Sequence, residues 1–176
     1  MKFILTPFEG LYEIDLNKIG DSRGWFKRTY DINLFSMNIP NFKGDWKQMN
    51  HSYSEKKYTW RGLHYQSSPF QESKLVRCVK GSIIDYALDL RKESSTYLKV
   101  FKINLSSKNG KTLYIPKGFA HGYFTLEDNT ELIYLVDEFY NPNYEKGVRY
   151  DDKKICLNLP LKPIIISEKD KSHKSL

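Results

Sequence analysis

The chain has 176 residues, which suits one domain with a substantial hydrophobic core, and carries a formal net charge of +7. Its 28 Lys and Arg residues are dispersed, whereas a nucleic-acid-binding protein would concentrate them on one face or element. No apolar run approaches the roughly 20 residues of a membrane span, and two cysteines are too few for a disulfide framework, so we expect a cytoplasmic protein that binds neither nucleic acid nor membrane.

Short segments of alternating polar and apolar residues, rich in Tyr and Phe, predict an all-β protein. The regular turn signals between them, such as Asn109-Gly110, favour a β-sandwich or jelly-roll barrel with a few short helices. In chain order, the predicted strands are Tyr12–Leu16, Trp25–Tyr30, Asp45–Ser52, Tyr58–His64, Lys74–Val79, Gly81–Asp89, Leu98–Leu105, Lys111–Ile115, Gly122–Leu126 and Glu131–Val136.

One helical turn is expected between the second and third of these strands, over Asn33–Met37. Asp31 or Asn33 can cap its start and Pro40 ends it. At the other end of the chain, residues 167–176 form a polar tail with little to bury, so they should be mobile unless Asp170 is tied into a site. We therefore expect a single domain over residues 1–176.

The segment Arg61-Gly-Leu-His64-Tyr-Gln66 suggests a catalytic centre. Strand alternation would put His64 on one face with Gly62 and Gln66, and Arg61 on the other face with Leu63 and Tyr65. Lys74 follows on the next predicted strand, so an imidazole and a cation can converge across a hairpin. A base beside a cation is what proton abstraction next to a carbonyl requires.

A second pattern, Gly110-x5-Pro116-x-Gly118-x2-His121, resembles the second cupin motif, in which a histidine lines the mouth of a jelly-roll barrel. The first cupin motif would supply His-x-His, but the tripeptide here is His64-Tyr65-Gln66. Two histidines alone make a poor site for zinc or iron. We therefore expect a cupin-like pocket without a metal or any other cofactor.

Taken together, the motifs resemble the dTDP-4-dehydrorhamnose 3,5-epimerase family, whose members act on nucleoside-diphosphate-4-keto-6-deoxysugars. The likeness runs along almost the whole chain. The segments that carry it are Asp21–Phe26, Gln48–Ser52, Arg61–Gln66, Lys74–Gly81, Asp85–Arg91, Ile115–Gly122, Tyr134–Tyr140 and Ile166–Asp170.

The resemblance implies a catalytic set for proton removal and return beside the C4 ketone. His64 resembles the base, Tyr134 the acid on the opposite face, Lys74 the cation that meets the enolate oxygen, and Asp170 the carboxylate behind His64. Without the resemblance, Tyr134 would be interpreted as a core residue. Asp85 and Asp89 compete with Asp170 as the partner of His64.

The resemblance also implies a substrate-binding set and a homodimer in which an N-terminal strand crosses to the partner. Thymidine-specific relatives have Glu where this chain has Arg28, so thymidine is expected while cytidine and guanosine stay open. His121 could equally hydrogen-bond the barrel mouth. The implied binding residues are Arg23, Phe26, Arg28, Gln48, Asn50, Arg61, His121 and Tyr140.

The expected function is inversion of C3 and C5 of a nucleotide-linked 4-keto-6-deoxy sugar through an enolate. A single-centre epimerase, acting at C3 only or C5 only, or a 3,4-ketoisomerase, remains an alternative. A protein of another class, a non-catalytic sugar-nucleotide-binding cupin, is also open.

Overall fold

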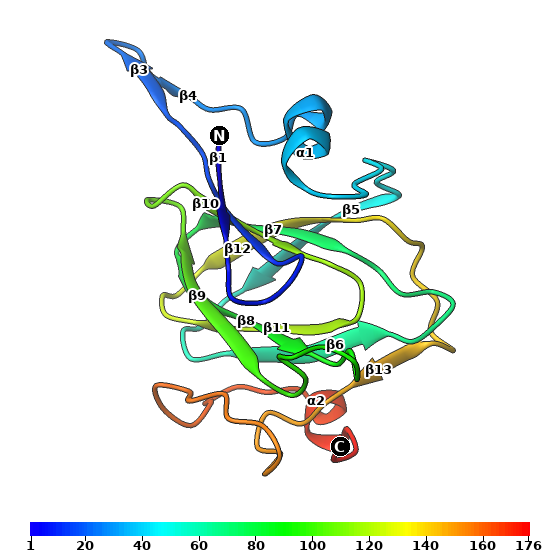
Figure 1. Cartoon of the computed structure of the whole chain (residues 1–176). Helices are drawn as coiled ribbons and strands as arrows, with labels where there is room; N and C mark the ends of the chain where they lie inside the picture. The colour runs from blue at the N-terminus through cyan, green and yellow to red at the C-terminus, as the bar shows by residue number, and fades with distance from the viewer.

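Two antiparallel β-sheets that pack face to face form the body of the protein (Figure 1), whose computed structural model describes residues 1–176. The six-stranded sheet has the order β1-β2-β10-β7-β12-β5 and the five-stranded sheet the order β13-β6-β11-β8-β9, while β3 and β4 form a separate hairpin. The elements are β1 (Lys2–Leu5), β2 (Tyr12–Asp15), β3 (Ile19–Asp21), β4 (Gly24–Phe26), α1 (Ile32–Asn38), β5 (Gln48–Ser54), β6 (Trp60–Gln66), β7 (Lys74–Lys80), β8 (Ser82–Asp89), β9 (Val100–Ser106), β10 (Lys111–Ile115), β11 (Phe119–Thr125), β12 (Thr130–Val136), β13 (Glu145–Gly147) and α2 (Glu168–Ser172).

The main core lies between the two sheets, where alternate residues of each strand point inward. The six-stranded sheet contributes Val76, Leu113 and Leu132, and the five-stranded sheet contributes Ile83 and Leu105, all fully buried. This alternation confirms the all-β, two-sheet architecture that the sequence predicts.

Both sheets also carry a covering on their outer faces. The C-terminal segment packs Val148, Ile155 and Leu157 against Trp60 and Phe124 of the five-stranded sheet. Because β11 is therefore covered on both faces, all seven of its residues are buried. On the other side, α1 and the residues after it cover part of the six-stranded sheet. Neither helix has the length and apolar character needed to cross a membrane.

The largest errors of the sequence prediction lie at the ends of the chain. The predicted strand Trp25–Tyr30 is only the three-residue β4, Gly24–Phe26, and β1 was not predicted. The tail is not wholly irregular, because Ser167 caps the one-turn helix α2 and Asp170 is buried. The short helix α1 agrees with expectation, since the Asp31 carboxylate accepts hydrogen bonds at its N-terminus.

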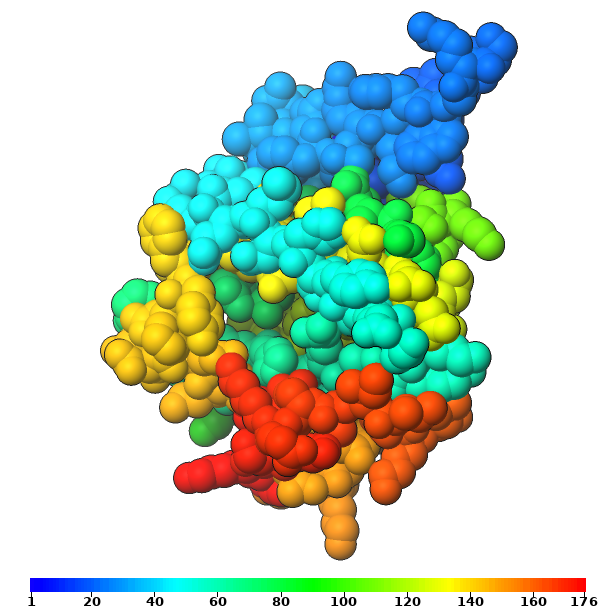
Figure 2. All heavy atoms as spheres, turned by 180° about the vertical axis from the view of Figure 1, so that it is seen from behind, coloured from blue at the N-terminus to red at the C-terminus, as the bar shows by residue number.

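The β3–β4 hairpin projects away from both sheets (Figures 1 and 2), at the end of the molecule opposite α2. It is unusually apolar for a projecting arm, because Ile19, Trp25 and Phe26 are each more than half exposed. Exposed apolar groups that cluster in this way mark an interaction surface more often than chance.

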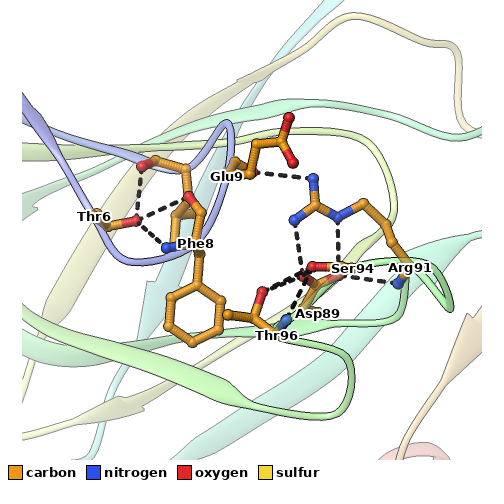
Figure 3. A network of polar contacts seen from close by, with 8 residues as sticks. Thr6, Phe8, Glu9, Asp89, Arg91, Ser94 and Thr96 are labelled. Atoms are coloured by element: carbon orange, nitrogen blue, oxygen red, sulfur yellow. Dashed lines mark hydrogen bonds and ion pairs between the residues drawn. The ribbon is translucent and has the colours of Figure 1, made fainter.

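A buried carboxylate fixes the loop between β8 and β9. Asp89 is fully buried and accepts hydrogen bonds from the guanidinium of Arg91 and from the hydroxyls of Ser94 and Thr96, at 2.6 to 2.9 Å (Figure 3). Arg91 also donates to the Glu9 carbonyl (Figure 3). Its guanidinium lies over the Phe119 ring. Asp89 thus ties the N-terminal turn and the 90–96 loop to the first residue of β11.

This network should make stability depend on pH in the acid range. Burial alone would raise the pKa of Asp89, but hydrogen bonds from Arg91, Thr96 and Ser94 outweigh it and lower the pKa to about 2. Because the folded-state pKa lies below the usual 3.8, the stabilisation is complete above pH 3.8 and is lost as the pH falls toward 2. It amounts to about 2 kcal/mol.

Urea unfolding of the wild type and Asp89→Asn, measured between pH 7 and pH 2, tests this. The difference in unfolding free energy should be largest near neutral pH and shrink below pH 4. The matched control is Asp151→Asn, which breaks an Arg–Asp pair of the same spacing at the surface and should cost at most about 1 kcal/mol. Equal, pH-independent losses in both variants would contradict the role assigned to burial.

Candidate active site

A cleft with two lobes opens between the sheets at the end of the molecule that α2 covers. The lobes measure about 500 and 320 Å³ and share three lining residues, His64, Lys74 and Tyr134. Figure 2 shows the hollow, bounded by the C-terminal segment in red and by segments in cyan and gold. The predicted base, acid and enolate-stabilising cation therefore line one continuous space.

His64 and Asp170 meet at the floor of the larger lobe. His64 Nε2 lies 2.7 Å from Asp170 Oδ1, and the other carboxylate oxygen accepts from the Gly62 backbone N–H at 3.1 Å. The Asp170 backbone N–H in turn donates to the Ser167 hydroxyl. Burial opposes ionisation of Asp170, but the hydrogen bond with His64 and its charge outweigh this and hold the pKa below its ordinary value. An ionised Asp170 fixes a proton on Nε2 and leaves Nδ1 as the free ring nitrogen.

The backbone around Gly62 departs from regular strand geometry. Gly62 has a φ of +129°, and a side chain there would collide with the backbone of Gly122 on β11. The pairing of β6 with β11 shifts register at the same place, between His121 and Tyr123. Consequently Arg61 and His64 both line the cleft, although simple alternation predicts opposite faces for them.

The wall opposite His64 belongs to the six-stranded sheet. Tyr134 of β12 points inward beside Lys74 of β7, whose side chain is 9% exposed. Lys74 Nζ lies 3.0 Å from a carboxylate oxygen of Glu72, which is also nearly buried. Burial, followed by the neighbouring Tyr123 and Glu72, raises the pKa of Tyr134. The phenol is therefore protonated at neutral pH, as a proton donor must be.

The three aspartates that compete for His64 in the sequence have separate partners. Asp170 contacts His64, Asp89 contacts Arg91, and the fully buried Asp85 contacts Nε2 of His121 at 2.7 Å. His121 also lines the larger lobe, next to His64 across the β6–β11 pair. Both interpretations of His121, as a cleft residue and as a hydrogen-bonded residue at the barrel mouth, are thus compatible with its position.

The smaller lobe collects further predicted binding residues. Gln48 and Asn50 of β5 line it together with Tyr140. The Gln48 side-chain carbonyl accepts from the Tyr140 backbone N–H at 2.8 Å, and the Tyr140 hydroxyl donates to Glu145 at 2.7 Å. Arg61 belongs to the larger lobe, where its guanidinium is held by the Tyr53 carbonyl and the Ser54 hydroxyl.

Three predicted binding residues lie outside the cleft of their own chain. Arg23 and Phe26 are on the projecting hairpin, where Arg23 pairs with Asp21. Arg28 follows the hairpin and pairs with Asp31 at the start of α1. The fold therefore assembles nine of the twelve predicted site residues around one cavity and leaves these three apart.

Sequence reasoning missed several residues of the cleft. Glu72 was not among the predicted site residues, although it stands two residues before Lys74 and pairs with its ammonium. The Tyr123 hydroxyl forms a 2.6 Å hydrogen bond with Ser52 at the cleft wall. His173, in the predicted polar tail, borders a neighbouring cavity, is 13% exposed and lies against His64. Nothing in the polar tail signals this packing.

Comparisons with known proteins point to one family. The family model described as dTDP-4-dehydrorhamnose 3,5-epimerase matches residues 5–176. The chain is 38% identical over 170 residues to the dTDP-4-dehydrorhamnose 3,5-epimerase of Shigella flexneri, covering 97% of this chain and 93% of that protein.

Two solved structures have the same fold over nearly their whole length. The Bacillus anthracis dTDP-4-dehydrorhamnose 3,5-epimerase with TDP and PPi bound has a TM-score of 0.93 and 36% identity, covering 99% of both chains. The Legionella pneumophila dTDP-6-deoxy-D-glucose-3,5-epimerase in complex with dTDP-4-keto-L-rhamnose has a TM-score of 0.90 and 32% identity, covering 99% of this chain and 92% of that one.

Proposed function

Because the chain belongs to the dTDP-4-dehydrorhamnose 3,5-epimerase family, we propose that it inverts C3 and C5 of dTDP-4-keto-6-deoxyglucose, acting as a single domain. The observation that carries this proposal is the position of His64 and Tyr134 on facing walls of one cleft, with Lys74 beside Tyr134. Inversion at carbon needs a proton removed from one face and returned to the other.

In the proposed reaction, His64 Nδ1 removes the proton from C5 or C3, and the electron pair of the C–H bond moves to the C4 oxygen to form an enolate. Asp170, ionised and hydrogen-bonded to Nε2, stabilises the imidazolium that results. Tyr134 then donates its phenolic proton to the opposite face of the carbon, and the enolate returns to the ketone. Before the second inversion, the His64 imidazolium loses its proton to solvent and the Tyr134 phenolate takes one up from solvent. The same steps at the second carbon then complete the double inversion.

Lys74 is proposed to donate a hydrogen bond to the C4 oxygen as negative charge develops there. A fixed cationic donor in a site that excludes water is worth about 3 kcal/mol to such a step. Its ion pair with Glu72 at 3.0 Å would hold the ammonium in place without a change of position during the reaction. The expected absence of a metal in the chemistry fits these roles, since the ammonium supplies the positive charge.

Product NMR after incubation with dTDP-4-keto-6-deoxyglucose in D₂O tests the proposed function. Deuterium should appear at both C3 and C5, and the product should have the L-rhamno configuration. Deuterium at one carbon alone would identify a single-centre epimerase, and movement of the ketone would identify a 3,4-ketoisomerase. Binding without any exchange would favour a non-catalytic protein.

We also propose that the enzyme is a homodimer whose β3–β4 hairpin completes the partner's cleft. Arg23 and Phe26 match binding residues of the family, yet they project far from the cleft of their own chain. The exposed apolar side chains of the hairpin would be covered by such an exchange.

The cytoplasmic location is also a proposal, and it is supported by the two cysteines, which are both free.

Mixed dimers should show whether the β3–β4 hairpin of one subunit completes the cleft of the other. His64→Asn and the double variant Arg23→Ala, Phe26→Ala should each be inactive alone, but a heterodimer joins an intact cleft to an intact hairpin at one of its two sites. Random association of equal amounts should therefore recover about a quarter of wild-type activity. If each hairpin served its own chain, mixing would recover none.

A further inference from the structure

Beside the proposed catalytic pair lies a third residue to which no role has been assigned. His173, just after α2, places its Nε2 3.7 Å from Asp170 Oδ1, and its ring meets the His64 ring edge-on at 5.6 Å between centroids. Its Nε2 is buried and has no hydrogen-bond partner. A buried ring nitrogen without a partner is uncommon in proteins and calls for an explanation.

The surrounding fold holds this ring in place. His173 packs over Gly147 of β13, where any side chain would overlap the imidazole. Gly147 itself pairs with His64 in the β13–β6 register, so the glycine creates a recess directly beside the proposed base. Asp170 cannot move away freely, because Gly62 N–H holds its second oxygen.

We propose that His64, Asp170 and His173 form an inhibitory binding site for zinc. The three donor atoms, two imidazole nitrogens and one carboxylate oxygen, lie within 4.8 Å of one another. Zinc accepts this ligand set in tetrahedral geometry, with donors about 3.3 Å apart and the fourth position taken by water. The donor separations of 2.7 and 3.7 Å to Asp170 lie on either side of that value, and the two imidazole nitrogens lie no more than 4.8 Å apart, so small side-chain shifts would bring all three to one ion.

Zinc in this position would stop proton abstraction without filling the cleft. A neutral imidazole carries one proton, and coordination through Nε2 leaves that proton on Nδ1. The lone pair that faces the substrate is then lost, while the smaller lobe with Gln48, Asn50 and Tyr140 stays open. Zinc should therefore reduce turnover and leave nucleotide binding nearly unchanged. This consequence rests on the proposed role of His64, whereas the binding site itself does not.

Zinc binding measured by equilibrium dialysis on the intact protein tests the site directly. Wild type should take up one zinc ion per chain, and His173→Gln should bind at least about 10-fold more weakly. The matched control is His51→Gln, which removes an exposed histidine that also contacts a carboxylate, Glu131, and should bind zinc like the wild type. Equal affinity in His173→Gln and the wild type would overturn the site.

Activity with zinc, divided by activity in EDTA for the same variant, tests the inhibition. The ratio should fall in the wild type and in His51→Gln, recover on adding EDTA, and stay near one in His173→Gln. Equal inhibition of His173→Gln would overturn the proposal. If zinc binds at one per chain but no variant epimerises the substrate even in EDTA, the proposed function fails and the zinc site stands.

Discussion

His64→Asn is expected to lower turnover by about 10³-fold, the usual contribution of a general base, with little change in nucleotide affinity. Asparagine is smaller than imidazole and fits the site without collision. Its amide does not extend to the Nε2 position, so the 2.7 Å contact with Asp170 is lost, but Asp170 keeps the hydrogen bond from the Gly62 N–H and the fold should be retained. Asparagine has no titrating nitrogen, so the substrate proton has no acceptor. Solvent deuterium should therefore fail to enter C3 or C5, as measured by NMR of the recovered sugar.

The control for this variant is His51→Asn, because His51 lies on the outward side of β5, is mostly exposed and pairs with Glu131. It should exchange deuterium at the wild-type rate. A His64→Asn protein that binds nucleotide and still exchanges at both carbons would remove His64 from the role of base and return attention to His121, which lines the same lobe.

Tyr134→Phe should separate proton removal from proton return. The phenylalanine ring can occupy the same place between Lys74 and Asn50 without the hydroxyl, so His64 should still form the enolate. The fate of the enolate changes, because the carbon is then reprotonated only by the conjugate acid of His64, on the original face. The variant should exchange deuterium at C3 or C5 while its rate of inversion falls by about 10² to 10⁴-fold.

Two further tyrosines sharpen the assignment. Tyr53→Phe alters an outward-facing residue of β5, whose hydroxyl contacts Asn129, and should preserve both exchange and inversion. Tyr123→Phe alters the hydroxyl that pairs with Ser52 in the cleft wall. If Tyr123→Phe loses inversion and Tyr134→Phe keeps it, the acid is Tyr123. If Tyr134→Phe loses exchange and inversion in parallel, Tyr134 shapes the cleft and is not the acid.

Most strands could be predicted because they are short segments rich in apolar, β-branched and aromatic residues and turns separate them, as in β7, β8 and β12. The failures have physical causes. The four residues of β1 form an edge strand whose pairing with β2 is not signalled by alternation. The segment after Phe26 has strand-like residues, but no neighbouring strand pairs with it, so it stays irregular. The short helix α2 depends on tertiary contacts of Asp170, which no local pattern shows.

The site residues divide in the same way, into those that a local pattern predicts and those whose position depends on tertiary contacts. His64 and Lys74 sit on predicted strands whose segments carried both the chemistry and the resemblance, whereas the role of Tyr134 came from the resemblance. Asp170 came from the resemblance alone, since a carboxylate in a polar tail has no local reason to be buried. The burial of His173 was not predicted, because it depends on the recess at Gly147, a glycine on the distant strand β13. Alternation also misplaced Arg61, because one glycine with positive φ reverses the expected facing.

The C-terminal covering of the five-stranded sheet has a consequence for the timing of activity during synthesis. Each strand of both sheets lies before residue 148, whereas the carboxylate that orients His64 comes at residue 170. A growing chain that has completed its sandwich therefore holds His64 and Tyr134 on their strands but lacks both the C-terminal wall of the larger lobe and the carboxylate that orients the base. Because chains fold from the N-terminus as they are made, the segment around Asp170, which emerges after every strand of the sandwich, would switch on the chemistry, and a nascent chain would be inactive until this segment docks.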